Sequence, residues 1–157
     1  MGHRALIVTG FIAAFAATSA AAGEEQGDAR DAPIVEALLT VGTPYRRGGT
    51  SPDTGFDCSG LVLHVFQRAW GLSLPRSVEA QRLVGKVVKR QHQLEPGDLV
   101  FYNTRNRPYS HVGIYVGGGQ FVHAPRPGRR VRIENIDSPY WRARFNGARR
   151  LQPDVLS

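Results

Sequence analysis

A single cysteine is the residue whose type and surroundings best suit covalent chemistry. Cys58 lies in the string GFDCSG, where Gly55 and Gly60 permit a sharp turn from a loop into a helix. A thiol in the first turn of a helix is close to partly positive backbone amides, which favour the nucleophilic thiolate. A free cysteine is often only a small buried apolar residue, but these polar and glycine neighbours indicate a reactive one.

Two histidines could provide the base that such a thiol needs. His111 begins the string HVGIYVG and His123 ends QFVH, with a run of three glycines between the two strings. We expect a hairpin centred on Gly117, with residues 111 and 123 paired, so that the two imidazoles lie side by side. One imidazole would accept the proton of Cys58 and the other would orient it. A zinc site with the same three side chains and a water is an alternative.

The elements that would position these side chains follow from hydrophobic spacing. Helices are expected over residues 33–41, from Cys58 to a stop at Gly71, over 78–84 after a cap at Ser77, and from Ser138. Residues 46–55 are expected to form a loop, and a basic connection should follow residue 84. Four successive strands are expected at LVFYN, HVGIYVG, QFVHA and VRIENI. We therefore predict an α+β fold in which N-terminal helices pack on a meandering antiparallel β-sheet.

The 157-residue chain divides into four expected segments. Residues 1–22 have the basic start, apolar run and small residues of a signal peptide, although an uncleaved anchor is an alternative. We expect a flexible lead over 23–32, one catalytic domain over 33–152, and a tail over 153–157. The protein should be exported, to the periplasm or into the medium, without stable membrane insertion after signal cleavage.

Charge and cysteine content limit the classes of partner. The formal net charge is +7, which suits an anionic partner such as a carboxylate-rich polymer. The arginines are scattered and accompany no nucleic-acid-binding motif, so we expect no nucleic acid as partner. A lone cysteine in an exported chain can form no internal disulfide. Separately, we expect the protein to be a monomer.

Five strings match a known family in order and separation: TPYRRGGTSPDTGFDCSGLV, LPRSVEAQ, LEPGDLVFYN, SHVGIYVGGGQFVHAP and YWRARFNGARRL. Over nearly all of residues 33–152 the sequence resembles the NlpC-type cell-wall cysteine peptidases, which have a compact papain-like fold. The resemblance implies that Cys58 is the nucleophile, His111 the general base and His123 the residue that orients this base.

The resemblance also implies roles for three residues near the cysteine. The hydroxyl of Tyr45 would join the Cys58 amide in an oxyanion hole. Asp57 and Ser59 would line a pocket for the free amino end of a stem peptide, although Asp57 is also placed to cap a helix. Arg47 occupies a position where related sequences often have an aromatic or aliphatic residue, which leaves the substrate preference open.

The implied reaction is hydrolysis of peptidoglycan stem peptides through a thioester on Cys58, and it calls for no metal or cofactor. The expected bond joins D-γ-glutamyl to a diamino acid, or crosslinks two stems. Two alternatives keep the same shape. One is a non-catalytic module that binds the wall or a partner, and the other is a thiol amidase or acyltransferase that acts on a lipid or a protein.

Overall fold

The computed structural model describes residues 21–153, with side chains from residue 29 onward. The expected signal peptide, 1–22, lies almost wholly outside the described residues. The elements in chain order are α1 (Ala21–Leu39), β1 (Thr50–Ser51), β2 (Gly55–Phe56), α2 (Cys58–Trp70), α3 (Val78–Gln81), β3 (Lys86–Val88), a 3₁₀ turn η1 (Gln91–Gln93), β4 (Leu99–Tyr102), β5 (His111–Gly117), β6 (Gln120–His123), β7 (Arg132–Asn135), α4 (Pro139–Arg142) and β8 (Phe145–Arg150).

Helix α1 is longer than the sequence predicts. The expected helix over 33–41 instead spans Ala21–Leu39, so the expected flexible lead over 23–32 is helical in this structure. Pro33 lies inside the helix, where it has no N–H to donate to the carbonyl of Ala29 four residues earlier. The indole Nε1 of Trp70 on α2 donates to that carbonyl at 2.7 Å. The second helix thus satisfies the acceptor that the proline leaves free.

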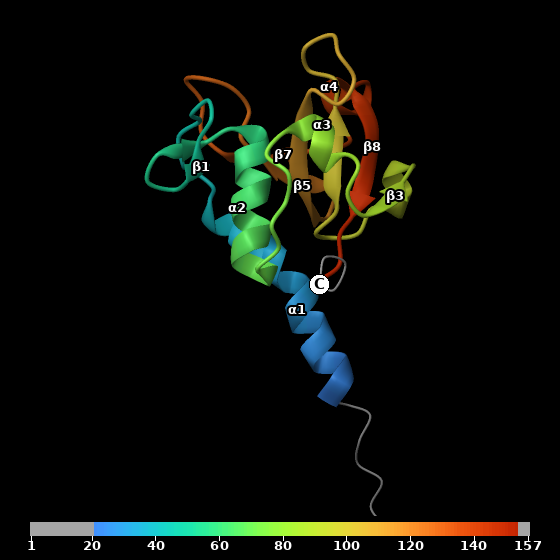
Figure 1. Ribbon diagram of the computed structural model, residues 1–157. Helices are drawn as coiled ribbons and strands as arrows, with labels where there is room; N and C mark the ends of the chain where they lie inside the picture. The colour runs from blue at the N-terminus through green and yellow to red at the C-terminus, as the bar shows by residue number, and fades with distance from the viewer. Residues whose placement is uncertain (1–20, 154–157) are drawn as a thin grey trace, which may run out of the picture.

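Helix α2 confirms its predicted start and end. The Asp57 side chain accepts from the Gly60 backbone N–H at the start, and Gly71 ends the helix with a left-handed φ of 67°. The buried side of α2 includes Leu61, Val65 and Phe66. Figure 1 shows α2 beside the sheet, while the first turns of α1 project away from the domain.

The six-stranded antiparallel sheet has the order β3-β8-β4-β5-β6-β7. The four predicted strands form the meander β4 to β7, as expected. Strands β3 and β8 were not predicted, and β8 inserts between β3 and β4. Gly147, with φ of 136°, and the paired arginines 149–150 hide the strand pattern of β8.

Shorter elements also differ from the predictions. The expected loop over 46–55 contains the small hairpin of β1 and β2. Helix α3 has the predicted Ser77 cap, whose Oγ accepts from the Ala80 N–H at 3.2 Å, but it ends at Gln81 rather than at residue 84. Helix α4 begins after Ser138, as predicted.

The predicted register of the histidine hairpin is wrong by two residues. Gly117 pairs with Gln120 around a two-residue turn at Gly118 and Gly119, both with positive φ, and Ile114 pairs with Val122. This register brings His123 opposite residue 113 rather than 111, because the turn lies after Gly117 and not on it. Both histidines still point to the same face of the sheet, since residues 111 and 113 have the same parity.

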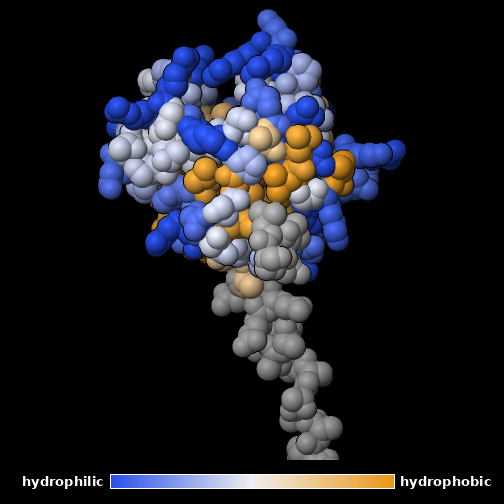
Figure 2. All heavy atoms as spheres, viewed as in Figure 1, coloured by the Kyte–Doolittle hydropathy of each residue, from blue (hydrophilic) through white to orange (hydrophobic). Residues whose placement is uncertain are grey.

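Each face of the sheet carries its own apolar cluster. Phe101, Val112 and Ile114 pack with α1 and α2 on one face. Tyr102, Phe121 and Trp141 are among the residues that pack on the other, under α4. In the surface view of Figure 2, hydrophilic side chains dominate the upper edge, where the loops after β4 and β6 lie in Figure 1, and an apolar patch lies lower down. No helix in the range 21–153 is long and apolar enough to span a bilayer.

Candidate active site

Cys58 is the first residue of α2, and a tightly packed glycine loop places it at a cleft. A Cβ on Gly60 would lie 2.0 Å from the carbonyl oxygen of Gly49, so only glycine fits there. Gly55 adopts a φ of +96°, which a residue with a Cβ rarely adopts. The loop therefore lies directly against the first helical turn, and Cys58 is half-buried and packs against the core.

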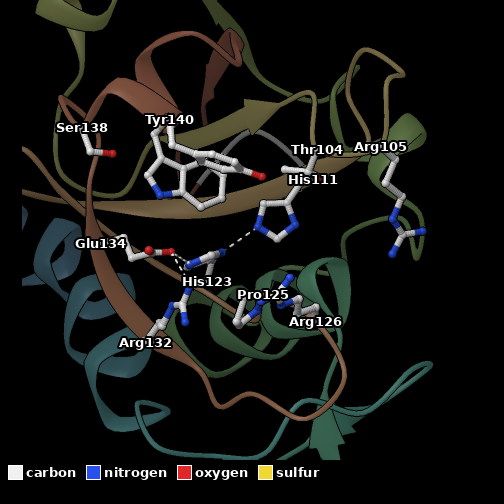
Figure 3. A pocket seen from close by; sticks show the side chains of 11 residues that line it. Thr104, Arg105, His111, His123, Pro125, Arg126, Arg132, Glu134, Ser138 and Tyr140 are labelled. Carbon is white, nitrogen blue, oxygen red and sulfur yellow. Dashed lines mark hydrogen bonds and ion pairs between the residues drawn. The ribbon is translucent and has the colours of Figure 1, made fainter.

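A chain of hydrogen-bonded side chains crosses three neighbouring strands. His111 on β5 contacts His123 on β6, with 2.7 Å between Nε2 and Nδ1. The Nε2 atom of His123 lies 2.5 Å from Oε2 of Glu134 on β7. Both imidazoles are buried, with exposed fractions of 4% and 0%. Figure 3 shows the three side chains in line, with the second ring nitrogen of His111 pointing away from His123.

Trp141 from α4 holds the two imidazoles in place. Its ring stacks on His111 at 5.8 Å and 23°, and it meets His123 edge-on at 5.1 Å and 87°. The ring of Phe121 supports the same cluster and occupies the space beside Gly113, where a Cβ would lie 2.6 Å from that ring. These contacts leave the imidazoles little freedom to rotate.

The environment of Cys58 differs from the expected thiolate. Burial raises the pKa of the thiol, and the neighbouring Asp57 carboxylate raises it further. Hydrogen bonds from the backbone of Val112 and Ser59 to the sulfur act in the opposite direction. This direction is opposite to the one expected from the first turn of a helix, because burial outweighs the stabilisation by these bonds.

The imidazole of His111 is also held neutral. Burial lowers its pKa well below 6.5, and the nearby His123 and Arg105 lower it further. Burial lowers the pKa of His123 as well, although its hydrogen bond to Glu134 opposes this effect. Cys58 and His111 are thus a neutral thiol and a neutral imidazole. The thiol proton would have to move to the imidazole as the sulfur attacks.

One hollow of about 490 Å³ lies on the Cys58 side of the cleft. Tyr45, Asp57 and Ser59 line it together with Arg76. One carboxylate oxygen of Asp57 accepts from Arg76 Nη2 at 2.7 Å and from the Gly48 N–H at 2.8 Å. The other accepts from the Gly60 N–H at 2.8 Å and from the Ser59 hydroxyl at 3.4 Å. All the usual acceptor positions of this carboxylate are therefore occupied.

The acidity of Asp57 and Tyr45 agrees with these contacts. Burial opposes ionisation of Asp57, but the hydrogen bonds from Arg76, Gly60 and Gly48 hold its pKa below the ordinary 3.8. Burial raises the pKa of Tyr45, and the nearby Cys58 and Asp57 raise it further, so the phenol is protonated and can donate.

A second hollow of about 480 Å³ lies on the histidine side. His111, His123, Glu134 and Tyr140 are among its lining residues. Arg105, from the loop between β4 and β5, lines both hollows, and Figure 3 shows it on the side of His111 that faces away from His123. Within residues 29–153, no group of three His, Cys, Asp or Glu side chains is close enough to hold a metal ion.

The sequence and the fold can be compared with those of known proteins. The sequence model of the NlpC/P60 family matches residues 42–150. This chain belongs to the NlpC/P60 family. The family stretch contains the cysteine, both histidines and Glu134.

Curated relatives of this NlpC/P60 chain are named as a hydrolase and an endopeptidase. Gamma-DL-glutamyl hydrolase of Bacillus subtilis (strain 168) is 47% identical over 123 residues, which cover 77% of this chain and 29% of the relative. Murein DD-endopeptidase MepH of Escherichia coli (strain K12) is 40% identical over 116 residues, 73% of this chain and 43% of the relative. The chain thus spans less than half the length of either relative.

Solved structures show the same fold. The NlpC/p60 domain of the peptidoglycan hydrolase SagA has a TM-score of 0.67 and 34% identity, covering 78% of this chain and 98% of that one. An NlpC/P60 family protein from Bacillus cereus ATCC 10987 has a TM-score of 0.69 and 33% identity, covering 77% of this chain and 39% of that one. The predicted α+β fold of this family is therefore confirmed.

All six site residues expected from the sequence line the cleft. Tyr45, Asp57, Cys58 and Ser59 surround one hollow, and His111 and His123 line the other, while their chemical roles stay predictions. The sequence analysis did not identify Arg76, Arg105, Glu134 or Trp141. Glu134 could have been predicted as a neighbour of His123, because strand β7 places residue 134 on the same face of the sheet as residues 121 and 123.

Proposed function

We propose that this NlpC/P60 protein is a cysteine endopeptidase that hydrolyses peptidoglycan stem peptides or their crosslinks. The observation that carries the proposal is that the sulfur of Cys58, at the head of α2, accepts a hydrogen bond from the backbone of Val112. Val112 follows His111, the first member of a buried pair of histidines that ends on a carboxylate. The name of the Escherichia coli relative, a murein DD-endopeptidase, supports this substrate, and the name of the Bacillus subtilis relative supports cleavage of a γ-glutamyl bond.

In the proposed reaction, the sulfur of Cys58 attacks the scissile carbonyl carbon while its proton passes to His111. The carbonyl oxygen becomes an oxyanion, which the backbone N–H of Cys58 and the hydroxyl of Tyr45 would stabilise. Collapse of this intermediate breaks the C–N bond, and His111 returns the proton to the leaving amine. Water then hydrolyses the thioester, with His111 as base, and restores the thiol.

His123 would act by orienting His111 rather than by touching the substrate. Its Nδ1 atom lies 2.7 Å from Nε2 of His111, so one ring nitrogen of His111 is held and the other is free to exchange protons. Asp57 and Ser59 would contact the acyl part of the substrate from the floor of the Cys58 hollow.

The chemistry of the cleft walls suits a substrate with several carboxylates. Arginine side chains line both hollows, at positions 47, 76, 105 and 107 on the Cys58 side and at 105, 126 and 132 on the histidine side. Stem peptides carry free carboxylates close to the bonds in question. Export to the periplasm or the medium would bring the enzyme to this substrate.

Mass spectrometry of muropeptides tests the proposal and identifies the bond. Purified peptidoglycan is incubated with the wild-type protein and with Cys58→Ala and His111→Ala variants. Cleavage after D-γ-glutamate shortens monomeric stems to dipeptides, whereas cleavage of a crosslink converts dimers into monomers and leaves monomers unchanged. We expect one of these products from the wild type alone. A folded wild-type protein that binds peptidoglycan without releasing any product would instead indicate a binding module.

A further inference from the structure

Glu134 completes the row of side chains behind the cysteine. Its carboxylate contacts Nε2 of His123 and also accepts from Arg132 Nη2 at 3.2 Å. We propose that Glu134 is a positioning residue that sets which nitrogen of each histidine carries a proton. This inference rests on the proposed role of Cys58 and His111 as nucleophile and base.

Glu134 is surrounded by groups that favour its ionised form. Burial opposes its ionisation, but the hydrogen bond to His123 and the charge of Arg132 hold its pKa below 4.5. An ionised carboxylate can only accept hydrogen bonds, so the proton between the two groups is on Nε2 of His123. Because burial keeps His123 neutral, its Nδ1 atom has a lone pair and must accept.

The proton position on His123 also determines that on His111. Since Nδ1 of His123 accepts, Nε2 of His111 must be the donor in the 2.7 Å contact between them. A neutral imidazole carries one proton, so Nδ1 of His111 has a free lone pair. That nitrogen is the atom that can take the proton of Cys58. Glu134 thereby sets which nitrogen of His111 can accept a proton, through the intervening ring of His123 and without touching the substrate.

Without the charge of Glu134, the opposite arrangement becomes available. His123 could carry its proton on Nδ1 and donate it to Nε2 of His111. His111 would then hold its own proton on Nδ1, where it could not accept another from Cys58. The carboxylate also stabilises the His111 imidazolium that forms when the thiol ionises, through the intervening ring.

The single cysteine makes the proposal measurable without any substrate. Because the sequence contains one cysteine, alkylation by iodoacetamide reports on Cys58 alone. We expect Glu134→Gln to slow alkylation at neutral pH about tenfold and to move its pH profile to higher pH. Asp137→Asn is the matched control, because it removes an exposed carboxylate that pairs with Arg142 at 3.6 Å outside the row. Equal profiles for a folded Glu134→Gln variant and the wild type would overturn the proposal.

A measurement on the unmodified protein covers the case in which the variant does not fold. Nitrogen-15 NMR of labelled histidine distinguishes the two tautomers of a neutral imidazole. We expect protonated Nε2 and unprotonated Nδ1 in both His111 and His123, and a proton on Nδ1 of His123 would refute the scheme. Neither experiment uses peptidoglycan. If the alkylation and NMR results are as expected but the wild type releases no muropeptides, only the proposed substrate is contradicted.

The arginines of the Cys58 hollow carry a second, independent inference. Asp57 has all its acceptor positions occupied, two of them by Arg76 and the Gly48 amide. Arg47 and Arg105 form no ion pair with any of residues 29–153. A free ammonium group would therefore meet a neutralised carboxylate and two unpaired guanidinium groups there.

We infer that this hollow binds a carboxylate on the acyl side of the scissile bond, with Arg105 as the specificity-determining residue. Arg105 is placed for this because it lines both hollows and thus lies beside the point of attack. On a D-γ-glutamyl bond, the group in question is the free α-carboxylate of the glutamate. A guanidinium matches a carboxylate in charge and planar geometry.

Binding to an inactive variant tests this inference separately from catalysis. Calorimetry with Cys58→Ala compares a stem peptide whose glutamate α-carboxyl is free with one in which it is a neutral carboxamide. We expect the free acid to bind at least tenfold more tightly, and Arg105→Gln in the same background to remove most of this preference. The control Arg142→Gln changes a guanidinium outside the cleft. Equal affinity for both peptides, or no binding of either, would overturn the inference even if the wild type cleaves peptidoglycan.

Discussion

Replacing Asp57 with alanine should destabilise the domain by about 3 kcal/mol. Loss of the helix cap on the Gly60 amide costs about 1 kcal/mol. Loss of the charge-assisted bond from the Gly48 amide costs about 1.5 kcal/mol. The pair with Arg76 adds only about 0.5 kcal/mol, because the arginine side chain is 43% exposed and water screens the interaction.

An Asp57→Asn variant separates the contribution of the Asp57 charge to stability from the contribution of its side-chain shape. Its amide oxygen can still cap Gly60, so we expect a loss of about 1 to 2 kcal/mol, smaller than that for alanine. Urea denaturation of the three proteins at neutral pH, followed by circular dichroism, measures both differences. An alanine variant within about 0.5 kcal/mol of the wild type, or an asparagine variant as unstable as the alanine one, would refute this assignment.

The difference in unfolding free energy between wild type and Asp57→Asn should change with pH in one direction. The folded state lowers the pKa of Asp57 below 3.8, so the unfolded chain takes up the proton first as the pH falls. The stabilisation by the charge is fully present above 3.8 and is lost as the pH falls through the lower folded-state pKa. The gap between wild type and Asp57→Asn should therefore shrink in acid. A gap that stays constant or widens there would contradict the linkage.

Three further substitutions test the packing around the site. Gly60→Ala should cost about 3 kcal/mol or more, because its Cβ would lie 2.0 Å from a backbone carbonyl oxygen, and a melting temperature within 2 °C of wild type would contradict this. Trp70→Phe removes the donor to the Ala29 carbonyl, so hydrogen exchange should quicken in the α1 amides near residue 33 while the sheet amides stay protected. Tyr102→Phe removes a buried hydroxyl with no partner among the described residues, and calorimetry should show unchanged or higher stability, not a loss.

Local signals predicted much of the fold and the site. The cap at Asp57 and the stop at Gly71 fixed the bounds of α2, since both act within one helical turn. Alternation of apolar residues identified the four strands from β4 to β7, and family motifs indicated Cys58, His111 and His123. These features depend on residues close together in sequence.

The features that sequence analysis missed depend on distant partners. Strand β8 contains few apolar residues and a glycine with a φ of 136°, and its pairing with β3 and β4 defines it as a strand. Arg76 becomes part of the site only because it reaches Asp57, nineteen residues earlier. The carbonyl freed by Pro33 in α1 is satisfied by Trp70, from the next helix. No local pattern contains this information.

Intact-protein mass spectrometry after rapid acid quenching tests the central claim most directly. The protein is mixed with excess stem peptide, quenched within milliseconds to seconds, and digested to locate any added mass. We predict an acyl adduct on Cys58 whose mass equals the N-terminal product minus water, and whose appearance requires His111. Product formation by the wild type without any adduct, together with retained activity of Cys58→Ala, would contradict the claim that Cys58 is the nucleophile.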